Sequence, residues 1–411
     1  MKLNASCKAE QETDILIVGG GLAGAALLLA LANSGYRCLL IETQCFSDRI
    51  SPEFDARTLA LSPASIRILQ MLQVWPRLQE HATAIEAIYV SEQSHFGGTR
   101  LFKNSEESLG SVIEMQHINQ ALHAMLDKQS ILAPARLIDW DKEKQIARIQ
   151  QGEQTRMIKT SLLVAADGIN SSVRRLLNLP AEVKDYHQVA VAANIGLARS
   201  HAHCAYERFT ATGPMAMLPM SGQRSSLIWA MPPAAGQELM ALDDKAFLLR
   251  LQKTFGYKLG RFIKAGKRHL FPLQQAIMPL QIQWPVVFVG NAAHTLHPVA
   301  GQGFNLGLRD VATLAQLIIE KGLNPPMLAA YQSMRRYDQN AISWFTDGLV
   351  ELFTSGLPGV GLARRIGLLA MDNSPILQKL LTYHARGFSG QVPDLACGIA
   401  LNHEKNNDRI G

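Results

Sequence analysis

Three uninterrupted apolar runs stand out along the chain, and each is followed at once by glycine or by Asp-Gly. They are Ile15 to Val18, Leu162 to Ala166 and Val286 to Val289. A short aliphatic run without polar alternation is typical of a strand that is buried on both faces of a sheet. A helical pattern from Ala25 to Ser34 and a second apolar strand, Cys38 to Ile41, follow the first run. The pattern predicts a β-α-β unit near the N-terminus.

The pattern changes between residues 186 and 274, where apolar and polar positions alternate. Gly-Pro and Ser-Gly steps divide this region into four short segments: Val189 to Ile195, Ala205 to Phe209, Ala216 to Leu218 and Ser226 to Met231. Alternation with a period of two predicts an antiparallel sheet. Further on, a helical pattern begins near Gly303, and a polar helix is predicted from Tyr331 to Phe345.

The composition narrows the class of protein. The 411 residues are 47% hydrophobic and 18% charged, which is typical of a globular chain and excludes a disordered or collagen-like one. The formal charge of +6 is spread along the chain rather than gathered in a patch, which argues against nucleic-acid binding. Five cysteines form no C-x-x-C pair and no zinc spacing, which indicates a reducing compartment, expected to be the cytoplasm.

The first strand runs into the segment GGGLAG at residues 19–24, which fits the dinucleotide-binding pattern G-x-G-x-x-G. Gly19 makes the turn, Gly21 lets backbone N–H groups approach a pyrophosphate, and Gly24 allows close packing of helix on strand. Glu42 ends the second strand 18 residues past Gly24, near the spacing expected for a carboxylate that holds ribose hydroxyls. A dinucleotide site is predicted, but this motif alone does not choose between NAD and FAD.

Two later segments make that choice. The second apolar run leads into Asp167 and Gly168, and the third leads into residues 290–307, GNAAHTLHPVAGQGFNLG. With the first motif, and in this order, they resemble the three fingerprints of the flavin-dependent aromatic hydroxylases, which have the fold of p-hydroxybenzoate hydroxylase. The resemblance implies FAD as cofactor and NAD(P)H as co-substrate. It also implies that Asp167 and Gly168 serve both and that the third segment lies along the flavin.

The third segment has a physical reading of its own. Gly301 and Gly303 remove side chains where a flat ring has to lie against backbone, and the amides of Phe304 and Asn305 begin the predicted helix. The positive end of a helix dipole is suited to the negative charge at the pyrimidine edge of reduced flavin. The resemblance assigns the catalytic positions to Pro298, His297 and Gly303.

Three further positions are carried over onto the FAD site by the resemblance. Arg57 follows the second strand where the family places an arginine near the flavin and its pyrophosphate. Gln120 matches a glutamine that touches FAD, although Ala121 replaces the arginine usually beside it. Asn291 stands where the family commonly has aspartate. Because the amide keeps an acceptor oxygen and loses the charge, we expect FAD to bind with modestly reduced affinity.

Part of the inserted region sharpens the resemblance. Glu207 to Thr210, followed by Gly213 to Met220, is similar to a segment of the hydroxylases of ubiquinone biosynthesis, as is Phe54 to Leu61. The likeness covers most of residues 14–380 and is strongest to the branch that acts on 2-polyprenyl-6-methoxyphenol. It implies hydroxylation of this phenol to the 1,4-benzoquinol with NAD(P)H and O₂, through a flavin C4a-hydroperoxide. Hydroxylation of another ring position and a non-catalytic flavin-binding subunit stay open as alternatives.

The partners implied are a polyprenylated phenol and O₂, while further ubiquinone-biosynthesis proteins and self-association stay open. The apolar and basic pattern from Leu349 towards Leu381 favours packing against the flavin domain or a partner subunit, and leaves open peripheral contact with the inner face of the cell membrane.

Two groups of side chains allow more than one interpretation. The first is either plain core or the lining of an apolar prenyl pocket, and comprises Met215, Met217, Met220, Trp229 and Met231. The second invites a metal hypothesis, and comprises His294, His297, His201, His203 and Cys204. Neither histidine set offers three or four ligands at the spacing of a metal site, so no metal is predicted.

Together the patterns and the resemblance predict an α/β fold with α+β elements. It consists of a Rossmann-like FAD-binding domain with an inserted antiparallel β-sheet substrate domain and C-terminal helices. We expect residues 1–180 and 275–345 to form the two parts of the FAD-binding domain and 181–274 to form the substrate domain. Residues 346–411 are expected to form a helical region and a tail whose last residues are disordered.

Overall fold

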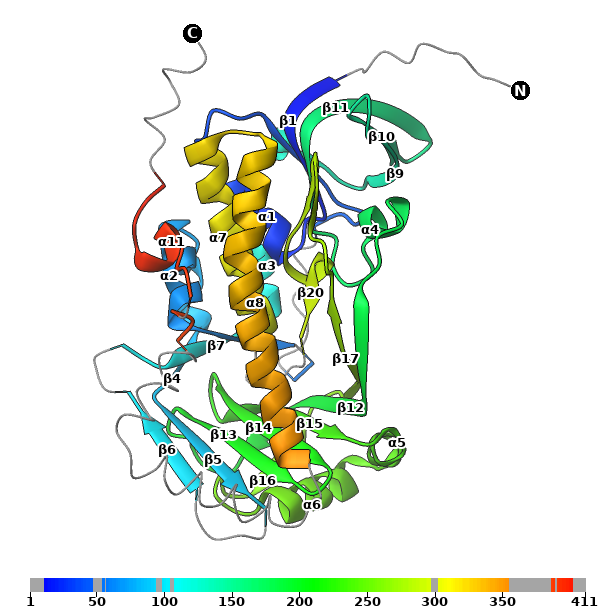
Figure 1. Ribbon diagram of the computed structural model, residues 1–411. Helices are drawn as coiled ribbons and strands as arrows, with labels where there is room; N and C mark the ends of the chain where they lie inside the picture. The colour runs from blue at the N-terminus through cyan, green and yellow to red at the C-terminus, as the bar shows by residue number, and fades with distance from the viewer. Residues whose placement is uncertain are drawn as a thin grey trace.

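The computed structural model describes residues 11–46, 54–55, 57–93, 98–103, 107–296, 302–354, 386–388 and 390–401. A parallel sheet lies at one end of the molecule and a larger, mostly antiparallel sheet at the other (Figure 1). The long strands β12 (Glu182–Leu197) and β17 (His269–Ile277) and the helix α8 (Pro325–Thr354) run between these two ends. This architecture confirms the predicted fold class.

The first sheet has the strand order β18, β19, β11, β1, β2 and β8, and the last five of these run parallel to one another. The hairpin of β9 and β10 joins this sheet through antiparallel pairing of β10 with β11. The bounds are β1 (Gln11–Val18), β2 (Cys38–Ile41), β8 (Ile131–Leu132), β9 (Arg136–Asp141), β10 (Ile146–Gln151), β11 (Gln154–Ala165), β18 (Ile282–Gln283) and β19 (Val286–Phe288). The three predicted apolar runs are therefore three neighbouring strands, β1, β11 and β19.

The central strands of this sheet are buried on both faces because two apolar layers cover them. Ile15 and Ile17 of β1 pack with the helices α1 (Leu22–Ala30) and α7 (Gln302–Lys321). Leu16 and Val18 pack on the other side, with the β9–β10 hairpin and α4 (Ser172–Leu176). Successive side chains of a strand point to opposite faces. A run without polar alternation is therefore what a sheet between two layers requires.

The larger sheet has the strand order β20, β17, β12, β15, β14, β13, β5 and β6, with β16 beside β12. Neighbours run antiparallel at its centre, and β13 and β5 run parallel. The further bounds are β5 (Ala87–Glu92), β6 (Gly98–Phe102), β13 (Cys204–Thr210), β14 (Gly213–Met220), β15 (Arg224–Met231), β16 (Phe262–Ala265) and β20 (His294–Thr295). The four strands predicted from alternation are β12 to β15. This sheet also takes β5 and β6 from the earlier part of the chain and β20 from the later part.

The outer face of the larger sheet is covered by α5 (Pro233–Ala241) and α6 (Asp244–Phe255). Met215, Met217, Trp229 and Met231 point to this face and are at most 5% exposed. They pack with aromatic and aliphatic side chains of α6. These four residues are core, so the structure decides against the prenyl-pocket interpretation for them. Met220, the fifth, lies on the opposite face.

A small three-stranded sheet lies between the two larger ones, with the strand order β3 (Thr58–Leu61), β7 (Gly110–Glu114) and β4 (Thr83–Ile85). The helices α2 (Pro63–Met71) and α3 (Met115–His123) flank it, and α11 (Asp394–Cys397) packs on α2 and α7. Within the ranges that the structure describes, no helix is long and apolar enough to cross a membrane. The C-terminal pattern towards Leu381 and the tail lie mostly outside the described residues.

Candidate active site

The glycine loop after β1 is shaped by close backbone approach. Gly19 has a φ of +106°, and a Cβ atom there would lie 2.6 Å from the carbonyl oxygen of Ala166. A Cβ atom on Gly24 would lie 1.9 Å from the carbonyl oxygen of Gly19, so no side chain fits where α1 crosses β1. A Cβ atom on Gly21, by contrast, would meet no protein atom within 4 Å. The first turn of α1 therefore opens onto space that an anionic group can approach.

Glu42 is held against this loop at the end of β2. One carboxylate oxygen accepts a hydrogen bond from the backbone N–H of Gly20, at 2.6 Å. The other accepts from Thr43 Oγ1 at 2.9 Å and from the backbone N–H of Gln44 at 3.0 Å. The predicted ribose-binding carboxylate thus lies beside the predicted pyrophosphate-binding loop.

The Asp167–Gly168 segment follows β11 and reaches the same loop. A Cβ atom on Gly19 would lie 2.8 Å from the Cα atom of Asp167. Asp167 Oδ2 accepts from Ser172 N at 2.6 Å and Ser172 Oγ at 2.7 Å, and so caps α4. Its Oδ1 atom is buried and has no hydrogen-bond partner among the described residues. A buried acceptor without a partner is costly, so it fits a donor from a bound group.

The third fingerprint meets the first at Gly290 and Asn291, which follow β19. A Cβ atom on Gly290 would lie 3.3 Å from the Cβ atom of Ala23, in the first turn of α1. Asn291 is exposed beside it. The three fingerprints, separated by more than a hundred residues in sequence, therefore converge on the N-terminal end of α1. This convergence, the open space at Gly21 and the unpartnered Asp167 oxygen fit a bound dinucleotide.

The start of α7 is tied to the small sheet by Asn305. This side chain is 2% exposed; its Nδ2 donates to the carbonyl oxygen of Ala60 at 2.9 Å, and its Oδ1 accepts from Ser62 N at 2.9 Å. Phe304 is half-buried, and a Cβ atom on Gly303 would meet nothing within 4 Å. The side chain of Asn305 therefore positions the helix start whose backbone amides are predicted to face flavin.

Replacing Asn305 with alanine will lower the free energy of unfolding by about 1–3 kcal/mol, because the buried N–H of Ser62 and the half-buried carbonyl of Ala60 lose their side-chain partner. The change is measured by urea denaturation. Asn170→Ala, at an exposed position, is the matched control and should stay within about 0.5 kcal/mol of the parent. Equal midpoints for the two variants would show that the Asn305 bridge does not hold the helix start.

The structure describes some of the other predicted site residues but not all of them. Arg57 precedes β3 and is exposed, and its carbonyl oxygen accepts from Met115 N at the start of α3. Gln120 is half-buried in α3. The same helix reaches the glycine loop through His123, whose Nε2 lies 2.8 Å from the Gly20 carbonyl oxygen. His297, Pro298 and Gly301 lie outside the described residues, so their predicted roles stay predictions.

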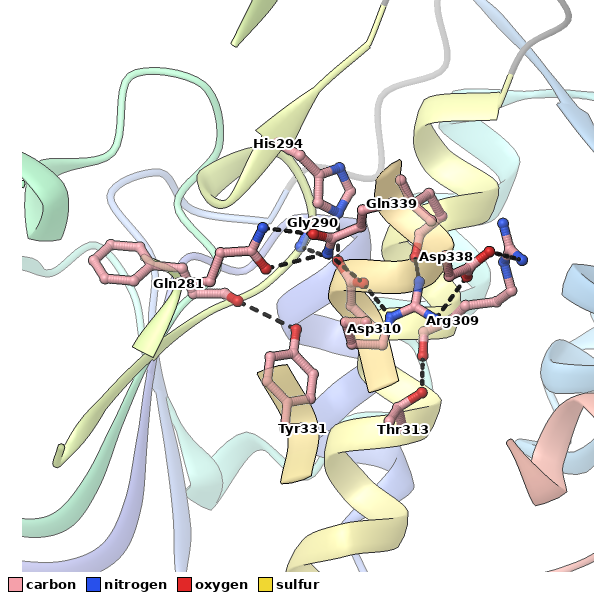
Figure 2. Close-up of polar contacts among 12 residues, drawn as sticks. Gln281, Gly290, His294, Arg309, Asp310, Thr313, Tyr331, Asp338 and Gln339 are labelled. Carbon is pink, nitrogen blue, oxygen red and sulfur yellow. Dashed lines mark hydrogen bonds and ion pairs between the residues drawn. The ribbon is translucent and has the colours of Figure 1, made fainter. Parts of the chain in front are cut away.

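A buried cluster of charged side chains, not predicted from the sequence, lies behind the third fingerprint (Figure 2). Its members are at most 2% exposed. They are His294, Arg309, Asp310, Arg335 and Asp338. Asp310 accepts from the backbone N–H of Gly290 at 3.0 Å, from His294 Nε2 at 2.5 Å and from Arg335 Nε at 2.7 Å. We call this set the Asp310 cluster.

The Asp310 cluster is neutralised internally. Arg335 also donates to Asp338 at 2.7 Å, and Arg309 donates to the other oxygen of Asp338 at 2.9 Å. Burial opposes ionisation of Asp310, but the charges and hydrogen bonds of His294 and Arg335 outweigh it and hold the pKa of this carboxyl below its usual range. The cluster therefore fixes Gly290 and His294, which flank Asn291, against α7 and α8. Arg309 and Asp310 come shortly after the third fingerprint, in α7, but nothing local pointed to Arg335 or Asp338.

A cavity of about 300 Å³ lies between the small sheet and the larger one. Its lining includes the buried ion pair of Arg224 and Glu114, 3.0 Å apart, and the stacked rings of His81 and His117. Burial lowers the pKa of His117, and the charge of His81 adds to this effect. Because a prenyl chain gains by burying apolar surface, this polar cavity does not suit it. No group of three or more metal-ligating side chains occurs within the described ranges.

Several known proteins are similar to this chain in sequence, in fold or in both. The model of the FAD binding domain family matches residues 12–342. The ubiquinone hydroxylase UbiL of Rhodospirillum rubrum is 34% identical, covering 96% of this chain and 94% of that protein. The 3-demethoxyubiquinol 3-hydroxylase of Escherichia coli is 29% identical, with 92% and 99% covered. The crystal structure of p-nitrophenol 4-monooxygenase PnpA from Pseudomonas putida has a TM-score of 0.75 at 15% identity, with 93% and 99% covered. At 15% identity, the similarity to PnpA shows a shared fold and nothing further.

Proposed function

Because the chain belongs to the FAD binding domain family, within its ubiquinone-biosynthesis flavin hydroxylases, we propose that it hydroxylates 2-polyprenyl-6-methoxyphenol to the 1,4-benzoquinol. It is an FAD-dependent monooxygenase that uses NAD(P)H and O₂. The observation that carries the proposal is the identity of 34% to a ubiquinone hydroxylase over 94% of its length. When bound, FAD supplies the redox chemistry: it takes up a hydride from NAD(P)H and passes one oxygen atom of O₂ to the substrate.

In this proposal the chain's own residues bind and orient the cofactor. The first turn of α1, opened by Gly21, receives the pyrophosphate, and Glu42 holds ribose hydroxyls. Asp167 accepts a hydrogen bond through its unpartnered oxygen. The site residues are then Gly19, Gly21, Gly24, Glu42, Arg57, Gln120, Asp167, Gly168, Asn291, Gly301, Gly303, Phe304 and Asn305, with Pro298 and His297 beside the reacting atoms.

In the same proposal, the start of α7 sits at the pyrimidine edge of the flavin. The N–H groups of Phe304 and Asn305 lie in the first turn of α7, and together with the positive end of the helix dipole they stabilise negative charge there. The side chain of Asn305 bonds Ala60 of β3 and Ser62 before α2, so it positions the helix start rather than the cofactor. The substrate ring lies between this helix start and the inner face of the larger sheet, the face that α5 and α6 leave uncovered.

Hydroxylation of another ring position is the second candidate, and one observation favours it. The Escherichia coli relative, 29% identical over 99% of its length, is a 3-demethoxyubiquinol 3-hydroxylase. That name assigns the relative to position 3 of a demethoxyubiquinol ring, whereas the first candidate hydroxylates the carbon para to the phenol hydroxyl. The choice between the two positions depends on how the ring is turned in the site.

Product analysis with the purified, FAD-loaded protein tests the proposal. A short-chain 2-prenyl-6-methoxyphenol is incubated with NAD(P)H and ¹⁸O₂, and the product is identified by mass spectrometry and NMR. We expect one labelled oxygen at the carbon para to the hydroxyl. Label at another carbon would replace the proposal with the second candidate. Oxidation of NAD(P)H with no oxygenated phenol would show that this phenol is not the substrate.

A further inference from the structure

Glu207 is a carboxylate on the inner face of the larger sheet, in the middle of β13. Its neighbours two residues away, Ala205 and Phe209, share its face, and Ala205 packs with Ile85 and Val112 of the small sheet. Tyr206 points the other way, into the core beneath α5 and α6. Because side chains alternate along a strand, Glu207 points away from the helices and towards the side on which the small sheet lies.

The residues beside Glu207 form an apolar row on the inner face of the sheet. In register across the strands, Glu207 lies between Val90 of β5 and Ala216 of β14, and the same row continues to Ile228 and Ala192. All five are half-buried. The row is apolar except for Glu207 and is built of small or aliphatic side chains. An apolar floor with one polar group is the usual composition of a small-molecule site.

Side-chain hydrogen bonds connect this inner face to the predicted flavin edge. Ser226, on the same face one row away, shares a hydrogen bond of 2.7 Å with Thr58 Oγ1 at the start of β3. Two residues further along β3, the carbonyl oxygen of Ala60 accepts from Asn305 at the start of α7. Glu207 is two strands and one row from Ser226, a separation of roughly 12 Å by sheet geometry. A phenol ring and its first prenyl unit span about this gap.

Within the part of the chain that the structure describes, no side chain compensates the charge of Glu207. Among the described residues, no hydrogen bond or ion pair engages its carboxylate. On the flanking strands, this face carries Glu92 of β5 as its other ionisable group, while Arg208 and Tyr206 point to the opposite face. Burial raises the pKa of Glu207 to about 7. A carboxylate with neither partner nor full hydration is costly to keep unless a ligand uses it.

We propose that Glu207 faces the hydroxyl of the phenol substrate and removes its proton, which makes the ring electron-rich before oxygen transfer. This inference rests on the proposed function and adds a catalytic residue to it. An apolar substrate needs few polar anchors, and a single acceptor aimed at its one hydroxyl sets both its ionisation and its orientation. The apolar row around Glu207 receives the ring and the start of the prenyl chain.

The proton balance of this step is simple. The phenol O–H bond breaks, the proton moves to a carboxylate oxygen of Glu207, and the electron pair stays on the phenolate oxygen. That charge spreads to the ortho and para carbons, and one of them bonds to the oxygen atom supplied by the FAD-dependent reaction with O₂. The hydrogen of that ring carbon then leaves as a proton and ends in the water formed from the second oxygen atom of O₂, while the proton on Glu207 returns to the phenol oxygen. Glu207 is then a carboxylate again.

The test is the variant Glu207→Gln, which keeps the size and polarity of the side chain but cannot take a proton. General-base assistance contributes about 10²–10⁴-fold to rate, so we expect hydroxylation at pH 8 to fall at least a hundredfold with FAD content unchanged. In the parent, the rate should rise with pH through about 7, where Glu207 loses its proton, and this limb should be absent from the variant.

A substrate that ionises without help provides the rescue. A ring-fluorinated analogue whose hydroxyl ionises near neutral pH no longer needs a base, so at pH 8 the variant should recover to within about tenfold of the parent. Two controls flank the site: Tyr206→Phe, one residue away on the opposite face, and Glu182→Gln, an exposed carboxylate on β12. Both should hydroxylate the ordinary phenol at the parental rate.

Stability gives a readout independent of turnover. The pKa of Glu207 is raised in the folded protein. Its contribution to the free energy of unfolding is therefore favourable below the unfolded pKa and is lost as pH rises through about 7. At pH 8 the Glu207→Gln variant should therefore unfold at a urea concentration equal to or above that of the parent, while Glu182→Gln should show no such gain. A parental rate and pH profile in Glu207→Gln, with the parent active, would overturn this inference alone. A parent that forms no hydroxylated phenol would overturn the proposed function with it.

Discussion

Replacing Gly21 with valine will yield a folded protein that binds no FAD. A Cβ atom at this position meets no protein atom within 4 Å, so the added side chain causes no clash in the apoprotein. It extends instead over the first turn of α1, where the pyrophosphate is proposed to approach the free N–H groups. We expect FAD affinity to fall at least a hundredfold, equivalent to about 2.7 kcal/mol. The measurements are flavin absorbance at about 450 nm per protein and far-UV circular dichroism.

Substitutions at two other glycines serve as controls for this result. Gly24→Val should fail to fold, because a Cβ atom there lies 1.9 Å from the carbonyl oxygen of Gly19. Gly35→Asn should leave folding and FAD unchanged, because the position is open, asparagine tolerates its φ of +79°, and it lies past the other end of α1. If Gly21→Val bound FAD as the parent does, the pyrophosphate would not lie at the N-terminal end of α1.

Replacing Arg335 with methionine will destabilise the protein by roughly 3–5 kcal/mol, because the change leaves buried carboxylates without their compensating charge. Asp310 loses its hydrogen bond to Arg335 Nε at 2.7 Å, and Asp338 loses its own at 2.7 Å. Methionine fills most of the volume, so the loss is electrostatic rather than a cavity effect. Urea denaturation at pH 7 measures it. Lys103→Met, which breaks an exposed pair with Glu86, should cost about 1 kcal/mol or less.

Two further measurements separate charge from packing in the Asp310 cluster. The double variant Asp310→Asn with Arg335→Met removes one charge of each sign, so it should lose clearly less stability than the sum of the single variants. The pKa of Asp310 is lowered in the folded protein. Its contribution is therefore present above the unfolded pKa of about 3.9 and is lost as pH falls through the folded pKa. Additive losses in the double variant would show that Arg335 acts through packing.

The Asp310 cluster also links stability to the cofactor site. Asp310 holds the backbone N–H of Gly290, and Asn291 follows directly. Loss of Arg335 should therefore also weaken FAD retention, although Arg335 lies on α8. Its hydrogen bonds reach the third fingerprint at the Leu306 carbonyl oxygen, and reach Gly290 indirectly, through Asp310. The FAD site and the Asp310 cluster therefore lie on the two sides of one loop, and a change in the cluster is expected to reach the FAD site through Gly290.

The sequence alone determined the parts of this protein that depend on local rules. An apolar run of four or five residues with glycine behind it specifies a buried strand and a tight loop, and β1, β2, β11 and β19 are found where the runs predict them. The glycine roles at Gly19 and Gly24 follow from the same reasoning, because a missing side chain acts on the backbone next to it. The order of the three fingerprints was enough to indicate FAD.

Only the tertiary structure decided the questions that involve two faces or distant partners. Alternation along β14 and β15 divides their side chains into two sets, but which set is core depends on where α5 and α6 pack, and they cover the methionines and Trp229. Asp310 meets Arg335 because α7 and α8 pack against each other, a contact that no local pattern encodes. Glu207 was visible only as part of a motif. It became a candidate base once the fold placed it on the face opposite α5 and α6, without a charge partner among the described residues.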